Sequence, residues 1–180
     1  MADLEYFKFV TNFALERFYL LILLFMKRKE KTSVILSVYN VLSKAKYGKM
    51  EDADKIKLWK IARALKPTAT QFEDDSKSAA EKFQPTEDFS ERLQKAQEFE
   101  RLSNTNGDMS KSPMGAAEYG EFIKEFQEYN KLVGEAVKEY ADKEVEIEIE
   151  PISEDAFAKL LASNEWTVEQ TIEVGAFVLE

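Results

Sequence analysis

The chain contains no cysteine and no histidine among its 180 residues. Without cysteine it can form no disulfide, thiolate metal site or thiol nucleophile. Without histidine it lacks the commonest general base and the usual partner of a serine nucleophile. Its 44% apolar content is nevertheless enough to build a core. These absences favour a binding or structural role over catalysis, and we expect no cofactor.

The net charge of −9 conceals a division along the chain. Residues 27–66 hold twelve basic and four acidic side chains, whereas residues 67–180 hold eleven basic and twenty-seven acidic ones. The basic section could dock on the acidic part of its own chain, bind a protein partner or contact the phosphates of a nucleic acid. Because the overall pI is 4.8, we favour the first two interpretations over nucleic acid.

Residues 1–25 form a separate, aromatic-rich segment. Its apolar run from Phe18 to Met26 is too short to span a bilayer, and the segment lacks the basic start of a signal peptide. It is either an amphipathic helix that packs on the body or on a partner, an interfacial membrane helix, or an extension from an early start codon ahead of Met26. We expect no membrane span, and we expect residues 26–180 to form a single, mainly helical domain.

Helical spacing of apolar residues predicts the first two helices of this domain. Thr32 or Ser33 is placed to cap a short helix that ends by Gly48. The next helix keeps one apolar stripe from Leu58 to Phe83, and this stripe continues across Pro67. We therefore expect one long, kinked helix there.

Two further helices follow in the middle of the chain. Apolar residues at helical spacing run from Phe89 to Phe99, and a loop rich in turn-forming residues covers Ser103 to Gly115. The most sustained pattern then runs from Tyr119 to Tyr140 and predicts a helix of at least six turns. We expect its aromatic stripe to pack antiparallel against the helix that contains Leu58–Phe83.

The stretch "KEVEIEIEPI", from Lys143 to Ile152, alternates acidic and β-branched residues and predicts a strand that Pro151 ends. Its two faces are Val145, Ile147 and Ile149 on one side and Glu144, Glu146, Glu148 and Glu150 on the other. A single strand cannot satisfy its own backbone groups. The strand therefore needs a partner in this chain or in another one.

The preferred partner is the stretch from Phe25 to Thr32, because Lys27, Lys29 and Lys31 alternate there with the opposite charge. Arg28 and Glu30 argue against this pairing, since they offer the apolar face of the strand no apolar neighbour. The alternative is an edge that stays free for a basic strand of another protein. That alternative makes the following residues candidates for partner binding: Glu144, Val145, Glu146, Ile147, Glu148 and Ile149.

Two short helices complete the chain. Ser153 caps the first, and "TVEQ" at residues 167–170 is a capping box for the second. The second helix carries Ile172, Val174, Phe177 and Val178 as its apolar residues. The predicted fold is therefore mainly α, with long antiparallel helices, a small β element formed by residues near 143–150 and near the N-terminus, and short C-terminal helices.

Three classes of function are consistent with these features. We favour a non-enzymatic protein that acts through contacts with a protein partner or with itself. The second class is a magnesium-dependent helical nucleotide hydrolase, since Glu118, Glu121, Glu125 and Glu128 share a helix face, but interleaved lysines indicate ordinary surface ion pairs instead. The third is a nucleic-acid-binding protein that uses a basic ridge around Trp59, formed by Lys55, Lys57, Lys60, Arg63 and Lys66.

The order of these segments resembles a family of small proteins of unknown function encoded by tailed bacteriophages and prophages. The resemblance covers Lys27 to Glu180 and rests on "SVILSVYNVLSKA", "KIKLWKIARALKP", "EFIKEFQEYNKLVGEAV", "KEVEIEIEPIS" and "WTVEQTIEVGAFVLE". It implies a phage or prophage origin and expression in the cytoplasm of a bacterial host, with no established activity. A protein-binding role in particle structure or assembly, in that cytoplasm or in the virion, is our hypothesis from the acidic strand, the division of charge and the missing catalytic residue types. The resemblance supplies no functional residues. Residues 1–25 depart from the family pattern, whose members begin near the position of Met26.

Overall fold

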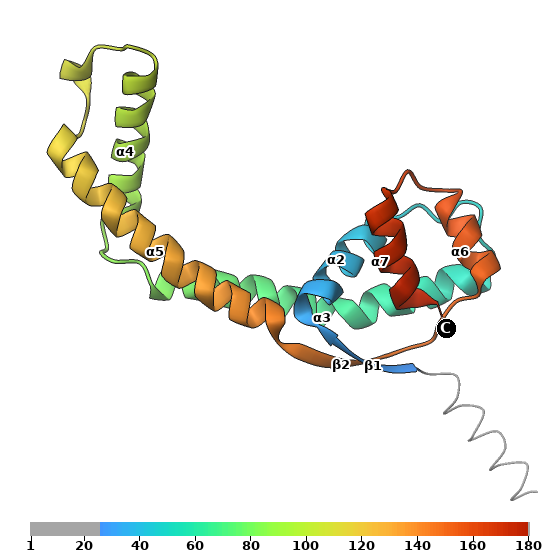
Figure 1. The fold of residues 1–180 in the computed structure, drawn as a ribbon. Helices are drawn as coiled ribbons and strands as arrows, with labels where there is room; N and C mark the ends of the chain where they lie inside the picture. Colours follow the sequence, from blue (N-terminus) through green and yellow to red (C-terminus); the bar gives the residue numbers. More distant parts are fainter. Residues whose placement is uncertain (1–25, 180) are drawn as a thin grey trace, which may run out of the picture. The chain divides into compact units, whose positions relative to one another are not determined.

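The structure is a computed structural model that describes residues 26–179. The predictions made for residues 1–25 lie outside the described part. Within that part the chain is mainly helical with one small sheet, as predicted (Figure 1). In chain order the elements are β1 (Met26–Lys31), α2 (Thr32–Leu42), α3 (Asp52–Lys82), α4 (Phe89–Asn104), the 3-10 helix η1 (Met109–Lys111), α5 (Ala116–Asp142), β2 (Glu144–Ile149), α6 (Glu154–Leu161) and α7 (Val168–Val178).

The described residues pack as two compact units. Unit 1 contains residues 26–71 and 142–179, and unit 2 contains residues 72–141. Helix α3 begins in unit 1 and ends in unit 2, and it is continuous through Pro67 as the sequence predicts. Pro67 and Arg63 are both exposed, so water can reach the Arg63 carbonyl that loses its helical N–H partner.

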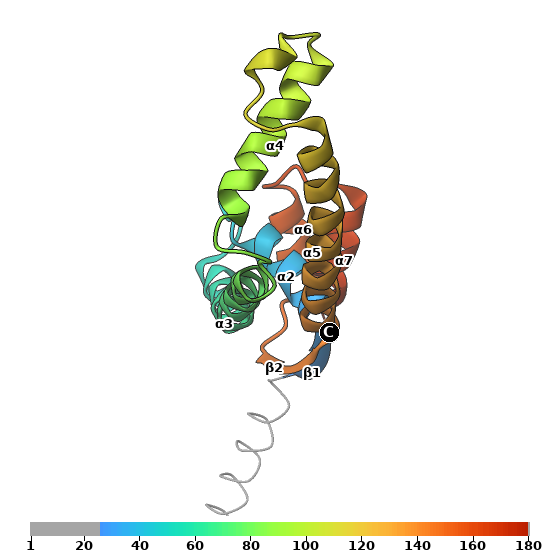
Figure 2. The same ribbon diagram turned by 90° about the vertical axis from the view of Figure 1, so that its left-hand side faces the viewer.

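The sheet of unit 1 is an antiparallel pair of β1 and β2. Lys27 lies opposite Glu148, Lys29 opposite Glu146 and Lys31 opposite Glu144. The partner segment that the alternating charges predict is therefore confirmed. Figures 1 and 2 both show the two strands side by side, although more than a hundred residues separate them in sequence.

Arg28 lies opposite Ile147 in the sheet, where the sequence analysis found no apolar partner on β1. Its guanidinium lies 5.4 Å from the centre of the Phe177 ring, and it donates a hydrogen bond to the Phe177 carbonyl. Because the long side chain lies over an aromatic ring of α7, its stem covers apolar surface while its charge keeps polar partners. Ile147 and Ile149 are buried beneath the sheet, with 6% and 2% of their surface exposed.

The core of unit 1 is mainly aliphatic and joins β2 to the four helices α2, α3, α6 and α7. Its largest fully buried side chains are Ile35, Val38, Leu42, Leu58, Ile61, Leu65, Ile152, Leu160, Val174, Phe177 and Val178. The side chain of Ser153 caps α6, and the predicted capping box of Thr167 and Gln170 is present at α7. The short C-terminal helices are therefore confirmed, and they close this core.

The predicted cap of α2 is wrong. The helix begins at Thr32, but no side chain caps it. Thr32 is buried, and both its N–H and its hydroxyl donate to the Lys143 carbonyl, at 2.8 and 3.0 Å. Thr32 therefore extends the ladder between the strands instead of capping the helix.

Unit 2 has an aromatic core. Phe89 of α4 packs against Phe122 and Tyr129 of α5, with ring centres 5.5 and 4.8 Å apart. Phe99 and Tyr119 stack at 4.4 Å. The aromatic stripe of α5 was expected to pack against the Leu58–Phe83 helix, but its first half packs against α4. This correction follows from connectivity, because α4 and α5 are consecutive long helices joined by residues 105–115, and consecutive elements usually pack as neighbours.

Candidate interaction surfaces

The basic residues predicted on α3 are only partly available to a partner. Lys55 pairs with Asp52 at 2.8 Å. The Glu150 carboxylate lies 2.9 Å from the Lys57 ammonium and 3.9 Å from that of Lys60. The chain's own carboxylates therefore neutralise much of the predicted ridge, as expected if the basic section docks on the acidic part of its own chain.

The remaining part of the ridge surrounds two exposed apolar side chains. Ile56 is 54% exposed and Trp59 is 57% exposed, and they are one helical turn apart on α3. The Arg63 guanidinium lies over the Trp59 ring at 5.2 Å, and Lys60 and Lys66 are exposed nearby on the same helix. We call Ile56, Trp59, Lys60 and Arg63 the α3 face.

A second exposed apolar pair lies on α7. Val168 is 77% exposed and Ile172 is 66% exposed, and Ala176 continues their row. Glu169 lies beside them on the same helix. We call Val168, Glu169, Ile172 and Ala176 the α7 face. Ile172, one of the apolar residues predicted for the last helix, does not share the buried side of that helix, because it lies about 160° around the helix from the buried Val174.

Only part of the α3 and α7 faces was predicted from the sequence. Trp59 was recognised inside the basic ridge, but Ile56 and Val168 were not singled out. The angle of each residue around the helix axis, measured from the buried residues, could have identified them. Ile56 is also about 160° from the buried Leu58, so a wheel centred on the buried stripe places both apolar pairs on the outside.

The predicted strand residues occupy the paired ribbon. On its exposed side the ion pairs are diagonal: Lys27 to Glu146 at 3.6 Å, Lys29 to Glu144 at 2.6 Å, and Lys31 to Asp142 at 2.7 Å. The hydrogen bond and the charge attraction between Lys29 and Glu144 raise the pKa of Lys29 and lower that of Glu144. β2 thus has its ladder partner within the chain, and Glu144, Val145, Glu146, Ile147, Glu148 and Ile149 all take part in that pairing.

The carboxylates that suggested a magnesium site do not meet. Glu125 pairs with Arg92 at 2.7 Å, and Arg92 also lies over the Phe122 ring at 5.2 Å. Across residues 26–179, no group of three or more side chains is arranged to hold a metal ion. Glu118, Glu121 and Glu128 therefore have no shared ligand geometry with Glu125 in the described part of the chain.

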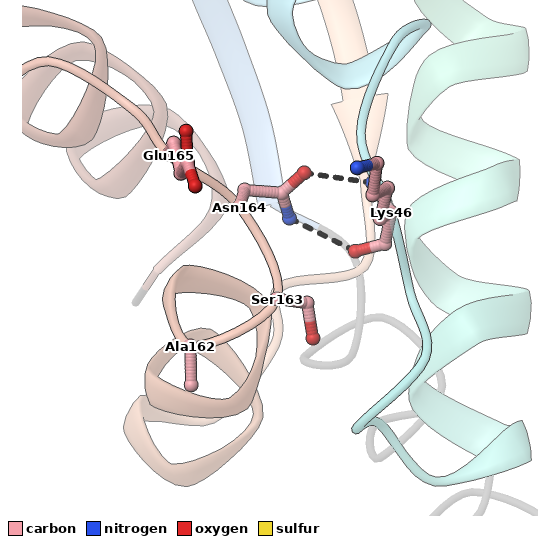
Figure 3. A pocket seen from close by; sticks show the side chains of 5 residues that line it. All are labelled: Lys46, Ala162, Ser163, Asn164 and Glu165. Atoms are coloured by element: carbon pink, nitrogen blue, oxygen red, sulfur yellow. Dashed lines mark hydrogen bonds between the residues drawn. The ribbon is translucent and has the colours of Figure 1, made fainter.

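A polar hollow of 270 Å³ in unit 1 is lined by Lys46, Ala162, Ser163, Asn164 and Glu165 (Figure 3). The Asn164 side chain bridges two loops, accepting from the Lys46 N–H at 2.8 Å and donating to the Lys46 carbonyl at 2.9 Å. It also donates to the Leu160 carbonyl at 2.8 Å. Because the Asn164 amide is occupied by these bonds, it fastens the loops and is not free to bind a ligand.

Within residues 26–179, no helix combines the length and the hydropathy needed to cross a bilayer. No family model, no curated protein and no solved structure matches the chain.

Proposed function

We propose that the chain is a non-enzymatic accessory protein of a phage or prophage that binds another protein through the α3 face, in the particle or during its assembly. The phage setting rests on the resemblance of segment order described above. The binding role rests on one observation: a tryptophan and an isoleucine are more than half exposed on neighbouring turns of the same helix.

The α3 face has the side chains that dominate the energy of protein interfaces. Tryptophan and arginine are enriched among residues whose loss most weakens binding. Trp59 and Arg63 already contact one another, which reduces the conformational freedom that either side chain loses on binding. The charge of Arg63, together with that of Lys60, whose ammonium lies 3.9 Å from the Glu150 carboxylate, favours a partner with acidic side chains around an apolar surface. The face therefore fits an amphipathic, acidic helix.

Nucleic acid is a second candidate for the same face. Trp59 lies beside Arg63 and near Lys66, and a base can stack on an exposed aromatic ring that has basic neighbours. The pairing of Lys55 and Lys57 with carboxylates reduces the charge available to phosphates. Protein is therefore the preferred partner.

A photo-crosslinking amino acid placed at position 59 tests this proposal. It is introduced into the full chain, in bacterial cells that also carry the phage or prophage genome encoding the protein. The matched control is the same amino acid at Met109, which is also exposed but lies in unit 2. We expect a protein adduct from position 59 and not from position 109. A nucleic-acid adduct would favour the second candidate, and no adduct at position 59 would contradict both.

A further inference from the structure

From these surfaces we infer that the α3 face of one copy binds the α7 face of a second copy of the same chain. This inference rests on the proposed function, because it names the partner of the same site. The chain would then carry both halves of its own interface and assemble head to tail.

The distribution of exposed apolar side chains is the first support. Among the described residues, the large apolar side chains that are most exposed are Ile56, Trp59, Met109, Val168 and Ile172. Four of these form two pairs on two helices of unit 1, at spacings of three and four residues. Such spacings place each pair on one helix face, and contiguous apolar surface of this kind is typical of interaction sites.

The charges around the two pairs are opposite. The α3 face has Lys60 and Arg63 beside its apolar pair. The α7 face has Glu169 beside its pair, Glu165 precedes the helix, and no basic side chain occurs between Glu165 and the C-terminus. The α7 face is thus an apolar helix surface with acidic neighbours, which is the chemistry that the α3 face favours.

The contact must form between copies. Val168 is 77% exposed and Ile172 is 66% exposed, and Ile56 and Trp59 keep more than half of their surface exposed, although all four belong to unit 1. The two faces therefore do not cover one another within one copy. Because different surfaces meet, each added copy leaves one face of each kind free, so the assembly grows as an open chain or closes as a ring.

The apolar part of this contact is small, since two large side chains contribute from each copy. Interfaces of limited size are weak and transient. We therefore expect association that increases with protein concentration and decreases with added salt, because the flanking charges are screened.

Two single substitutions in the full chain test the inference. Trp59→Glu places a negative charge on the α3 face and leaves the α7 face intact. Ile172→Lys places a positive charge on the α7 face and leaves the α3 face intact. By sedimentation velocity over a concentration series, we expect wild type to self-associate and each variant alone to lose more than about tenfold in association constant.

An equimolar mixture of the two variants is the decisive sample. Each pair of unlike copies retains one intact α3 face and one intact α7 face, so the mixture should form a one-to-one dimer that grows no further. This rescue would also show that both variants are folded. Met109→Glu and Met109→Lys are the controls, because they introduce the same charges at an exposed apolar position of unit 2. Both controls should associate as wild type does.

Three results would overturn the inference: wild type that remains monomeric at the highest concentration, self-association that both substitutions leave unchanged, or a mixture in which the variants stay apart. Association through any other part of the chain would produce the second result. If wild type is monomeric but position 59 still crosslinks to a different protein in cells, the proposed function stands and only the second copy is excluded. If no adduct forms in cells and wild type is monomeric, both fail.

Discussion

Unit 1 draws its core from both ends of the described chain, whereas unit 2 draws its core from helices that follow one another in sequence. In unit 1, strands that begin at Met26 and Glu144 pair, and aliphatic side chains fill the space beneath them. In unit 2, the aromatic rings that meet belong to α4 and α5, two consecutive long helices joined by residues 105–115. One unit therefore depends on distant contacts, and the other depends on local ones.

Burial differs between the units in the same direction. Several core side chains of unit 1 have no exposed surface, including Ile35, Leu58 and Val174. In unit 2, Phe122 is fully buried, but Phe126 and Tyr129 keep part of their surface exposed. Elements with fewer buried apolar contacts open more readily. The comparison therefore predicts that unit 2 opens before unit 1.

Replacing Ile147 by proline should have the largest effect, because it attacks the distant pairing that unit 1 needs. The Thr32 N–H bonds to the Lys143 carbonyl, so the alternation of an antiparallel ladder makes Arg28 and Ile147 a hydrogen-bonded pair. Proline removes that N–H and the buried side chain together. We expect a loss of about 3–8 kcal/mol in the free energy of unfolding, measured by urea denaturation.

Glu146→Pro is the matched control for this substitution. Glu146 lies opposite Lys29 in a pair without mutual hydrogen bonds, so its N–H points to the outer edge, where proline is tolerated. Its effect should be much smaller than that of Ile147→Pro. Equal effects would mean that the ladder does not have the register described above.

Phe122→Ala should have the second largest effect, and it should be confined to unit 2. The ring is fully buried between Phe89 and the Arg92 guanidinium, so its removal should cost about 3–5 kcal/mol. Hydrogen exchange should become faster for amides of α4 and α5, while those of β1 and β2 stay protected. Equal loss of protection in both units would show that they unfold as the single domain expected from the sequence.

Asn164→Ala should have an intermediate effect on unit 1. It removes a side chain that makes three hydrogen bonds and joins the loop before α3 to the loop after α6. We expect a loss of about 1–3 kcal/mol, measured by thermal unfolding. Asn164→Asp keeps the acceptor that faces the Lys46 N–H, but its second carboxylate oxygen replaces the donor and faces the Lys46 and Leu160 carbonyls, so it should be no more stable than the alanine variant.

Glu144→Gln should have the smallest effect, and this effect should depend on pH. The pKa of Glu144 is lowered in the folded state by its hydrogen bond with Lys29, so the ion pair stabilises the fold above the ordinary glutamate pKa. That stabilisation disappears as the pH falls through the lowered value. Melting temperatures of wild type and variant should differ slightly at neutral pH and coincide in strong acid. A difference that persists in acid would contradict this account.

The distant pairing in unit 1 was predicted from the sequence as the preferred of two alternatives, the other being a free edge. Charged residues alternate with a period of two in both segments, which indicates strands, and the charges of the two segments are opposite, which favours pairing between them. The packing of Arg28 over Phe177 was not predictable in the same way, because it needs the position of α7. Arg28 is polar by type, but its long side chain covers apolar surface in this position.

The local packing in unit 2 was harder to predict. The stripes of α3, α4 and α5 are all apolar with the same helical period, and periodicity alone does not indicate which stripes meet. The two candidate surfaces show a related limit. Trp59 and Ile172 are apolar by type, and only their angles relative to the buried Leu58 and Val174 show that they face outward.

The ribbon also imposes an order of events during synthesis. β1 leaves the ribosome long before β2, because more than a hundred residues separate Lys31 from Glu144. At common rates of translation this delay is on the order of ten seconds. During this delay the backbone N–H and C=O groups of β1 have no partner strand, and an unpaired strand edge promotes aggregation. The lysines at positions 27, 29 and 31 give the unpaired β1 segment a dense positive charge. Nascent chains on neighbouring ribosomes therefore repel one another until the glutamates of β2 have been synthesised.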